Sequence, residues 1–429
     1  MTLAINLDEV YRACDPDRPL SAMDERYVDL SGVRGTNVIA KTISRSISRC
    51  DSLHFHQQLL TGHRGSGKST ELLRLKAELE VQKLFVIYID AEELLDLVDL
   101  NYLDVLLSIA KETESVLRKQ GIMLNDTLLE NLSAWFSERV VEKSESNEMS
   151  GALSAQAEAG ANIPFFAKLM TRITAEIKSA SSRRTTTRQK LKQELAVFIE
   201  KLNVLIDDAR NKVRQSGYKD VVLIVDGLEK MHYDLLDDKK STHEHLFVVH
   251  AEQLKAPRCH IVYTMPISLV YNANLGNDFD NILVIPMVKT NAEGMDCLRQ
   301  VIAKRVDIGK TFEQVELVDR LTRLSGGVMR DLMRLIRLAT DTDEEKISAK
   351  EISYAETTLI REYDRLLRDD EFEHVKWVRE NHRVAGEEVY ARMLNLRLIL
   401  EYQNGERWAD LHPAVLEISW VKKRLLENA

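Results

Sequence analysis

Eight consecutive residues, Gly62 to Ser69, have the types and the spacing that hold a triphosphate. They read Gly-His-Arg-Gly-Ser-Gly-Lys-Ser and fit the pattern G-x-x-x-x-G-K-[ST] without a gap. Glycines permit positive φ angles and a close approach of the main chain, so successive N–H groups can converge on phosphate oxygens. The motif predicts that Lys68 places its charge on the β- and γ-phosphates and that Ser69 offers its hydroxyl to Mg²⁺.

The residues around this loop indicate a strand before it and a helix after it. An apolar run ends at 59–61, and Leu72, Leu75 and Leu79 recur at helical spacing. A helix that starts at the loop puts its positive N-terminal end under the anion. A glycine-rich turn without a ligand is the alternative, which this context disfavours. The expected contacts of ATP or ADP with this loop are Gly62, His63, Arg64, Gly65, Ser66, Gly67, Lys68, Ser69 and Thr70.

A second apolar run, 221–225, ends in Asp226 and is followed three residues later by Glu229. A carboxylate at the end of a strand can hold Mg²⁺ through water, so the predicted magnesium site consists of Ser69 and Asp226. Glu229 is the nearest carboxylate that can orient an attacking water. An incidental aspartate after a buried strand is the weaker interpretation, because a P-loop needs an acidic partner of this kind.

Two further side chains complete the predicted catalytic set. The apolar run 259–264 ends in Thr264, which we expect beside the phosphates, bonded to the γ-phosphate or the attacking water; an ordinary strand end fits equally well. Arg330 follows the glycine pair 326–327 at a helix start and can fold back over a nucleotide, with Arg334 as the alternative. The catalytic candidates are therefore Glu229, Asp226, Thr264 and Arg330.

The segment 1–52 reads as a loop-rich lead-in followed by a helix, at the place where many P-loop proteins pack the adenine. Tyr27, Val28 and Val33 can supply an apolar slot for the base. Arg34 can anchor the phosphate loop, and we include it among the expected nucleotide contacts. A plain docking loop is nearly as good an interpretation.

The composition is that of an ordinary globular chain. It has 429 residues, 44% hydrophobic and 30% charged, and a net charge of −9, enough for a full core and more than one domain. The four cysteines lack metal-ligand spacing and suit a reducing cytosol, so we predict a cytoplasmic protein. The N-terminus does not read as a signal peptide, and no apolar run reaches the ~18 residues that span a bilayer. Net acidity disfavours non-specific nucleic-acid binding.

Other apolar runs predict the remaining strands and helices. The runs at 84–90 and 281–286 read as further buried strands of a parallel sheet, and the region after 290 reads as wholly helical. Asn404-Gly405 between two apolar runs predicts a hairpin, and two helices before it suggest a winged helix over 370–429.

The stretch from 101 to 219 is longer than a P-loop core needs. It reads as mostly helical, with a possible extended arm where apolar residues alternate over 153–163. The basic run of Arg183, Arg184, Arg188, Lys190 and Lys192 is most simply solvated surface, and the alternative is an arginine finger for a neighbouring subunit. Further along, His243 and His245 are interpreted as helix surface, because their spacing is not that of a zinc motif.

These residues together resemble AAA+-related P-loop ATPases, and most of all the STAND group of signalling ATPases. The Asp-Gly-Leu-Glu sequence at 226–229 is similar to the D-G-L-D of STAND proteins. Thr264 falls at the family's sensor 1 position and Arg330 at its sensor 2 arginine. Leu411-His412-Pro413 is similar to the M-H-D motif, so the resemblance adds His412 as an ADP phosphate contact. Pro413 stands where that motif has aspartate, and a buried structural histidine is at least as good an interpretation.

The resemblance implies an α/β fold: a P-loop NTPase core, AAA+/STAND-like, whose parallel sheet is flanked by helices, with a helical lid and a C-terminal winged-helix-like domain. The implied domains are the lead-in 1–52, the core 53–288 with its insertion at 101–219, the lid 289–369 and the winged helix 370–429.

The implied function is a nucleotide-operated switch. ADP keeps the lid and winged helix closed, whereas ATP with Mg²⁺ opens them and permits self-association into a homo-oligomer. Hydrolysis to ADP and phosphate is expected to be slow, because Gly227 occupies the place of the usual AAA+ glutamate. Partner proteins would supply sensor and effector, and bacterial members of the group often act in antiviral defence.

Two other functions were weighed against the switch. A DNA-binding ATPase similar to the origin-recognition loaders is the alternative, although residues 370–429 hold 9 Lys/Arg against 11 Asp/Glu, which disfavours DNA. A metabolic kinase lacks a recognisable acceptor site.

Overall fold

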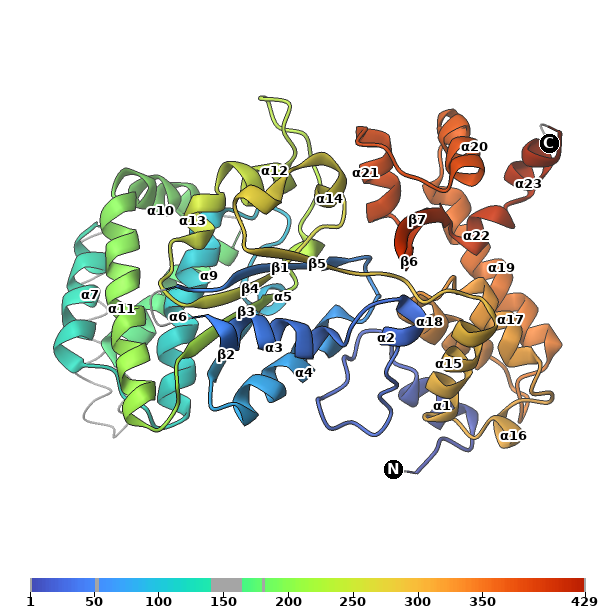
Figure 1. Cartoon of the computed structure of the whole chain (residues 1–429), viewed down its shortest axis with the longest axis horizontal. Helices are drawn as coiled ribbons and strands as arrows, with labels where there is room; N and C mark the ends of the chain where they lie inside the picture. Colours follow the sequence, from blue (N-terminus) through green and yellow to red (C-terminus); the bar gives the residue numbers. More distant parts are fainter. Residues whose placement is uncertain (1, 51–53, 140–163, 180–181, 428–429) are drawn as a thin grey trace.

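The computed structural model describes residues 2–50, 54–139, 164–179 and 182–427 (Figure 1). Its centre is a five-stranded sheet in the order β2-β3-β4-β1-β5, and all four strand pairings are parallel. The strands are β1 Gln57–Gly62, β2 Phe85–Asp90, β3 Val221–Asp226, β4 His260–Met265 and β5 Asn281–Ile285. The predicted α/β fold with a parallel sheet flanked by helices is confirmed.

Helices cover both faces of this sheet, which is why its central strands are apolar almost throughout. Every residue of β3 and β4 is buried. On one face the strands pack against α3 (Ile39–Arg49) and α4 (Lys68–Val81). On the other face they pack against helices of the 101–219 insertion. Because the strands are parallel, their carboxyl ends meet at one edge, and that edge carries the phosphate loop.

The insertion is helical where the structure describes it. Its helices are α6 Tyr102–Lys119, α7 Asp126–Arg139, α9 Phe165–Lys178, α10 Ser182–Gln193 and α11 Leu195–Gln215, which lie together beside the β2 end of the sheet (Figure 1). Apolar residues recur at helical spacing from Leu191 to Leu205, but they belong to two helices, α10 and α11, since Glu194 between them departs from helical geometry (φ −107°, ψ 24°). The extended arm expected at 153–163 lies outside the described residues.

Neither interpretation of the basic run describes Arg184 and Arg188. Arg184 forms ion pairs with Asp96 and Asp99, and Arg188 with Asp99 and Asp104, all from the same chain. Asp104 is buried, so these pairs hold α10 against the start of α6. These two arginines are therefore neither plain solvated surface nor available to a neighbouring subunit.

The C-terminal half is a second helical body with its own apolar core. It contains α15 Ala292–Ala303, α16 Ile308–Thr311, α17 Leu317–Leu324, α18 Met329–Ala339, α19 Ala349–Leu366, α20 Phe372–Asn381, α21 Glu388–Asn395, α22 Pro413–Leu416 and α23 Ser419–Glu427. The hairpin predicted at Asn404-Gly405 is present as β6 Ile399–Asn404 and β7 Glu406–Leu411, with Gly405 at φ +76°. A capping box of Ser348 and Glu351 starts α19.

The N-terminal segment joins this second body. It contains α1 Leu7–Ala13, which the sequence did not predict, and α2 Ser31–Arg34. Ala4 forms a bridge with Val306, and Val10 lies in the same apolar core as α18. The stretch between α1 and α3 therefore runs between the sheet and the helical body (Figure 1).

Short elements complete the chain. They are α5 Ala91–Leu94, η1 Leu228–Lys230, α12 Thr242–Glu244, the π-helix His245–Val249, α13 Ala251–Lys255, α14 Leu269–Asn272, η3 Leu275–Asn277 and η4 Asp369–Glu371. His243 in α12 is buried and bonded to Ser268 and the carbonyl of Met231, so its interpretation as helix surface is wrong. Across the described ranges, no helix is long and apolar enough to cross a membrane.

Candidate nucleotide-binding site

The predicted phosphate loop lies between β1 and α4, as the motif requires. β1 ends at Gly62 and α4 begins at Lys68. Gly65 has φ +82° and Gly67 has φ +97°, the left-handed region that glycine adopts without strain. A Cβ atom on Gly65 would lie 2.5 Å from Cβ of Arg330, so this position needs glycine for space as well as for conformation.

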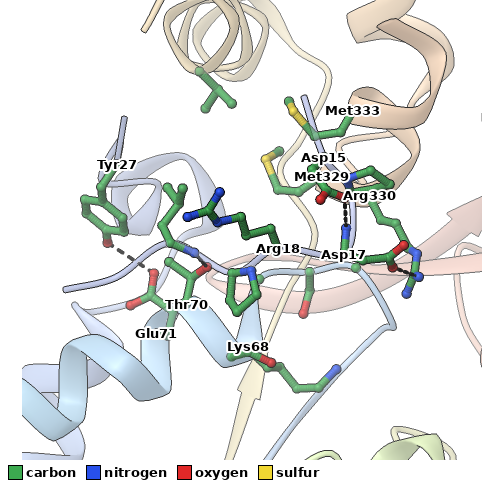
Figure 2. Close-up of a pocket in the computed structure, with 18 of the residues that line it drawn as sticks. Asp15, Asp17, Arg18, Tyr27, Lys68, Thr70, Glu71, Met329, Arg330 and Met333 are labelled. Atoms are coloured by element: carbon green, nitrogen blue, oxygen red, sulfur yellow. Dashed lines mark hydrogen bonds and ion pairs between the residues drawn. The ribbon is translucent and has the colours of Figure 1, made fainter. Parts of the chain in front are cut away.

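A cavity of about 290 Å³ lies against this loop, and several separate parts of the chain line it. Figure 2 shows the loop residues facing the N-terminal segment and α18 across it. The lining includes Arg64 to Glu71 from the loop and α4; Asp15 to Leu20, Tyr27, Val28, Leu30 and Arg34 from the N-terminal segment; Val301, Arg305, Met329, Arg330 and Met333 from the helical body; and Glu92, Glu229 and Lys230. The lining thus combines charged side chains with apolar ones such as Val28, Met329 and Met333.

The N-terminal segment closes the cavity through specific contacts. The Leu20 N–H donates to the Thr70 hydroxyl at 3.1 Å, and the Tyr27 hydroxyl donates to Glu71 at 3.1 Å. Tyr27 and Val28 line the cavity as expected of an adenine slot. Val33 instead packs on the core of the helical body.

Arg34 anchors the phosphate loop, as the sequence suggested. Its guanidinium is buried and donates to the carbonyl of Ser66 within the loop. Burial lowers the pKa of Arg34, and the nearby Glu71 carboxylate opposes that effect. Its Nε atom has no partner among the described residues, and the same is true of the buried Ser66 hydroxyl oxygen. Both atoms suit an anion at the loop.

Lys68 and Glu229 form a buried ion pair at the centre of the site. The Lys68 ammonium lies 3.1 Å from Oε1 of Glu229 and donates to the carbonyls of Gly62 and His63 at 2.8 and 3.0 Å. Burial acts to raise the pKa of Glu229, but the charge of Lys68 and the Thr264 hydroxyl hold it below its ordinary value. Glu229 is therefore a carboxylate, placed where the lysine of the loop holds it.

Asp226 lies beside this pair and uses one of its oxygens within the protein. Tyr88, on the neighbouring strand β2, donates its hydroxyl to Oδ2 of Asp226 at 2.6 Å. Burial and the adjacent Glu229 charge raise the pKa of Asp226, whereas Ser69 and Tyr88 oppose the rise. Oδ1 of Asp226 and Oε2 of Glu229 are buried without a partner among the described residues. Two such carboxylate oxygens next to a serine hydroxyl fit a hard divalent cation.

Thr264 stands between the two acidic residues and the loop, because β4 separates β3 from β1. Its hydroxyl accepts the N–H of Leu228 at 3.0 Å, which fixes the turn after β3 that carries Glu229. Thr264 is fully buried and is not part of the cavity lining. The structure thus places it behind Glu229.

Arg330 and Arg64 reach the loop from different sides. The N–H of Arg330 donates to the carbonyl of Gly65 at 3.3 Å, and its side chain pairs with Asp17 (Figure 2). Arg64 lines the cavity, and its Nη2 lies 3.5 Å from the carbonyl oxygen of Glu229. Arg334, the alternative to Arg330, pairs with Glu362 outside the cavity lining.

Two of the expected nucleotide contacts turn their side chains away from the cavity. His63 points to the C-terminal hairpin. His412 is fully buried, stacks on Tyr363 and has Nε2 at 3.5 Å from Asp331. His412 therefore has the surroundings of a structural histidine, which was the alternative interpretation.

Sequence reasoning missed Tyr88, Asp17 and Glu71. Tyr88 belongs to a predicted strand, but its pairing with Asp226 depends on β2 lying next to β3. Asp17 and Glu71 are charged residues in a loop and on a helix, and their positions in the sequence carry no motif. The oxygens that could bind a metal at this site are those of Asp226, Ser69 and Glu229. Within the part of the chain that is described, no separate cluster of three or more His, Cys, Asp or Glu could hold a metal ion.

Comparison with known proteins gives structural similarity only. No family model matches the chain, and no curated protein matches it. A Walker-type ATPase of Pyrococcus abyssi is 14% identical with a TM-score of 0.40, over 95% of this chain and 99% of that one. Cdc6p of Pyrobaculum aerophilum is 14% identical with a TM-score of 0.42, over 99% and 100% of the two chains. A variant of Thermotoga maritima RuvB is 11% identical with a TM-score of 0.36, over 93% and 95%.

These similarities are low, so the description of the site rests on its own geometry. The phosphate loop between β1 and α4, the strand order and the acidic pair after β3 are those of a P-loop fold.

Proposed function

We propose that this chain binds and slowly hydrolyses ATP, and that it works as a STAND/AAA+-type switch that controls its own association and a partner effector. The observation that carries the proposal is a cavity that the phosphate loop, the N-terminal segment and α18 line together. A ligand in that cavity contacts every part at once, so its binding is coupled to their arrangement.

Nucleotide binding would use the residues already gathered at the loop. The main-chain N–H groups from Gly65 to Ser69 and the N-terminus of α4 suit the phosphates. Lys68 would move from the loop carbonyls to the β- and γ-phosphates. Apolar residues of the lining, among them Val28, Met329 and Met333, suit a base.

Ser69 and Asp226 are the residues that would hold Mg²⁺. When bound, the ion neutralises charge that develops on the phosphates. Glu229 is held as a carboxylate and can accept a proton from, or orient, an attacking water. The pair with Lys68 must loosen before Glu229 can do so, which supports slow turnover.

Control of association and of partners is the less direct part of the proposal. It is supported by the resemblance of residues 226–229 to the STAND group and by the contacts of the phosphate loop with α21 and the C-terminal hairpin. ADP would favour the closed arrangement, whereas ATP with Mg²⁺ would favour a homo-oligomer. A protein partner would supply sensor or effector, and bacterial antiviral defence is the setting that the resemblance suggests.

The test is the mass of the purified protein, freed of endogenous nucleotide, with ADP and then with ATP and Mg²⁺. Light scattering or mass photometry should show a defined oligomer only with ATP, and Lys68→Ala should stay unchanged. A mass that is the same in all states and for both proteins would contradict the switch. Duplex binding with a steep salt dependence would instead favour the loader-type alternative.

A further inference from the structure

One side chain of the phosphate loop binds the C-terminal region through both of its ring nitrogens. The main-chain N–H of Glu401, at the start of β6, donates to Nε2 of His63 at 2.9 Å. Nδ1 of His63 lies 3.2 Å from the carbonyl oxygen of Leu394, near the end of α21. Since Nε2 accepts a hydrogen bond, the ring proton is on Nδ1, which donates to Leu394.

The His63 ring makes these hydrogen bonds in the interior of the protein. The side chain is fully buried, and burial lowers its pKa to about 3, so it remains neutral with one donor and one acceptor. In the sequence, Leu394 lies 331 positions after His63, and Glu401 lies 338 positions after it. They are direct contacts between a residue of the phosphate loop and the main chain of α21 and β6.

The segment that His63 holds, 394–401, is also fixed by other parts of the molecule. Arg397 within it has φ +63°, a strained conformation for this residue, and its guanidinium lies 3.1 Å from the buried Asp331 of α18. Asp331 follows Arg330, which lines the cavity. His63 and Asp331, each next in the sequence to a residue that lines the cavity, therefore both contact this segment.

Glu401 secures the far end of this segment. Its carboxylate accepts a hydrogen bond from the Tyr271 hydroxyl at 2.6 Å and from Arg407 at 2.6 Å, and its carbonyl accepts the N–H of Met287 at 2.9 Å. Tyr271 and Met287 belong to the sheet side of the molecule, in the segments before and after β5. The start of the hairpin is thus docked on the sheet, and His63 is its contact with the loop.

We infer that His63 is a latch between the phosphate loop and the C-terminal hairpin, released when a nucleoside triphosphate draws Lys68 away from the loop carbonyls. The inference rests on the proposed nucleotide binding. Lys68 donates to the carbonyl of His63 itself. The residue whose carbonyl holds the lysine is therefore also the residue whose ring contacts Leu394 and Glu401. Phosphates that take over Lys68 remove this bond and leave the Ser66 N–H, at 3.1 Å, as the remaining partner of the His63 carbonyl.

Coupling of this kind is reciprocal. If ATP loosens the contact of His63 with Leu394 and Glu401, then breaking that contact raises the affinity for ATP by the same factor. A partner that pulls on the hairpin would likewise change nucleotide affinity. His63, rather than His412, is therefore the histidine that connects nucleotide and hairpin in this chain.

The experiment measures hydrogen exchange of the Glu401 amide and the affinity for a fluorescent ATP analogue in the full chain. In wild type, ATP with Mg²⁺ should speed exchange at Glu401 by about tenfold, within the usual range of allosteric coupling. His63→Phe keeps a buried ring without hydrogen bonds; it should speed exchange without nucleotide and bind ATP several-fold tighter. His63→Gln keeps a donor and an acceptor, so its Glu401 exchange rate and its ATP affinity should be close to those of wild type.

His260→Asn is the matched control. His260 is also buried and accepts a main-chain N–H, from His56 at 2.9 Å, but it lies at the amino end of β4, away from the phosphate loop. In this variant, the exchange rate of the Glu401 amide and the affinity for ATP should both match wild type. Exchange at Glu401 that responds neither to ATP nor to His63→Phe overturns the latch, and so does faster exchange with unchanged or weaker ATP affinity. Absence of any ATP binding by wild type contradicts the proposed function instead.

Discussion

The ammonium nitrogen of Lys68 lies 3.1 Å from Oε1 of Glu229, and both side chains are almost completely buried. The pair joins the loop after β1 to the turn after β3, across the intervening strand β4. Since the same nitrogen is needed on the phosphates, nucleotide binding and this ion pair compete. Binding of a nucleotide at the loop therefore requires this pair to rearrange.

Removing Lys68 should affect stability as well as binding. Lys68→Ala leaves the Glu229 carboxylate buried without a partner, a change that typically costs about 3–5 kcal/mol. The double variant Lys68→Ala/Glu229→Gln should recover most of that free energy of unfolding, measured in urea, while neither variant binds nucleotide. Lys76→Ala, which breaks an exposed pair with Glu80, should cost less than about 1 kcal/mol. Equal stability of the single and double variants would mean that Glu229 takes up a proton.

Glu229→Gln should separate binding from turnover. The amide keeps the size of the side chain and cannot accept a proton, so ATP should bind and remain unhydrolysed. The measurement is the nucleotide recovered with the protein after incubation with ATP and Mg²⁺, together with the rate of phosphate release. Phosphate release at the wild-type rate would remove Glu229 from the catalytic role and leave it as the partner of Lys68.

Tyr88 should matter for magnesium more than for the nucleotide itself. Its hydroxyl holds Oδ2 of Asp226 and so leaves Oδ1 directed to the site. Residues that orient a metal ligand typically change metal affinity by about 10–100-fold, so Tyr88→Phe should raise the Mg²⁺ concentration needed for tight ATP binding by about tenfold. ATP binding in EDTA should be unchanged.

Tyr263→Phe provides the control for this test. Tyr263 is equally buried, but its hydroxyl donates to the carbonyl of Leu254, away from the phosphate loop. The magnesium dependence of this variant should match wild type. The same shift in both tyrosine variants would point to a general loss of stability.

Arg330 and Arg334 should differ although they lie one helical turn apart. Arg330 lines the cavity and pairs with Asp17, which is largely exposed, so a phosphate can take its place at small cost. Arg330→Ala should weaken ATP binding by about tenfold, the value of one charge-assisted hydrogen bond. Arg334→Ala, which loses only its pair with Glu362 and its proximity to Asp331, should bind ATP as wild type does. Calorimetric titration of both variants distinguishes them.

The strands and the phosphate loop could be predicted because their signals are local. The run before Gly62 and the run at 221–225 are apolar since both faces of the sheet are covered, and the loop is a motif of fixed spacing. Arg34 was predicted as an anchor of the loop because it lies in the lead-in that P-loop proteins place beside the nucleotide. These inferences needed only neighbouring residues.

The remainder of the site depends on contacts that the sequence does not display. Tyr88 meets Asp226 only because β2 pairs with β3, and Asp17 meets Arg330 from a distant part of the chain. His63 was expected to contact nucleotide because it lies in the motif, yet its ring faces Leu394 and Glu401. The motif constrains the main chain of the loop, whereas the side chain at this position can contact other parts of the fold.

The pH dependence of stability should report His63 directly. The pKa of this ring is lowered from 6.5 to about 3, because burial disfavours its charged form. The unfolded chain therefore binds a proton that the folded chain does not, and the contribution to stability is complete above pH 6.5 and is lost as the pH falls toward 3. Each pH unit in that window costs about 1.4 kcal/mol, or about 2 kcal/mol between pH 6.5 and 5.

His63→Gln removes this titration and should flatten the curve by one proton. His260 and His243, each with a pKa lowered to about 4, keep part of the slope in both proteins, so the difference between the two curves isolates His63. The measurement is the free energy of unfolding in urea at several pH values between the lowered pKa values of these rings and neutrality. Parallel curves would show that the His63 ring takes up its proton at the same pH in the folded and the unfolded chain, and its acceptor bond from Glu401 would then be incompatible with the data.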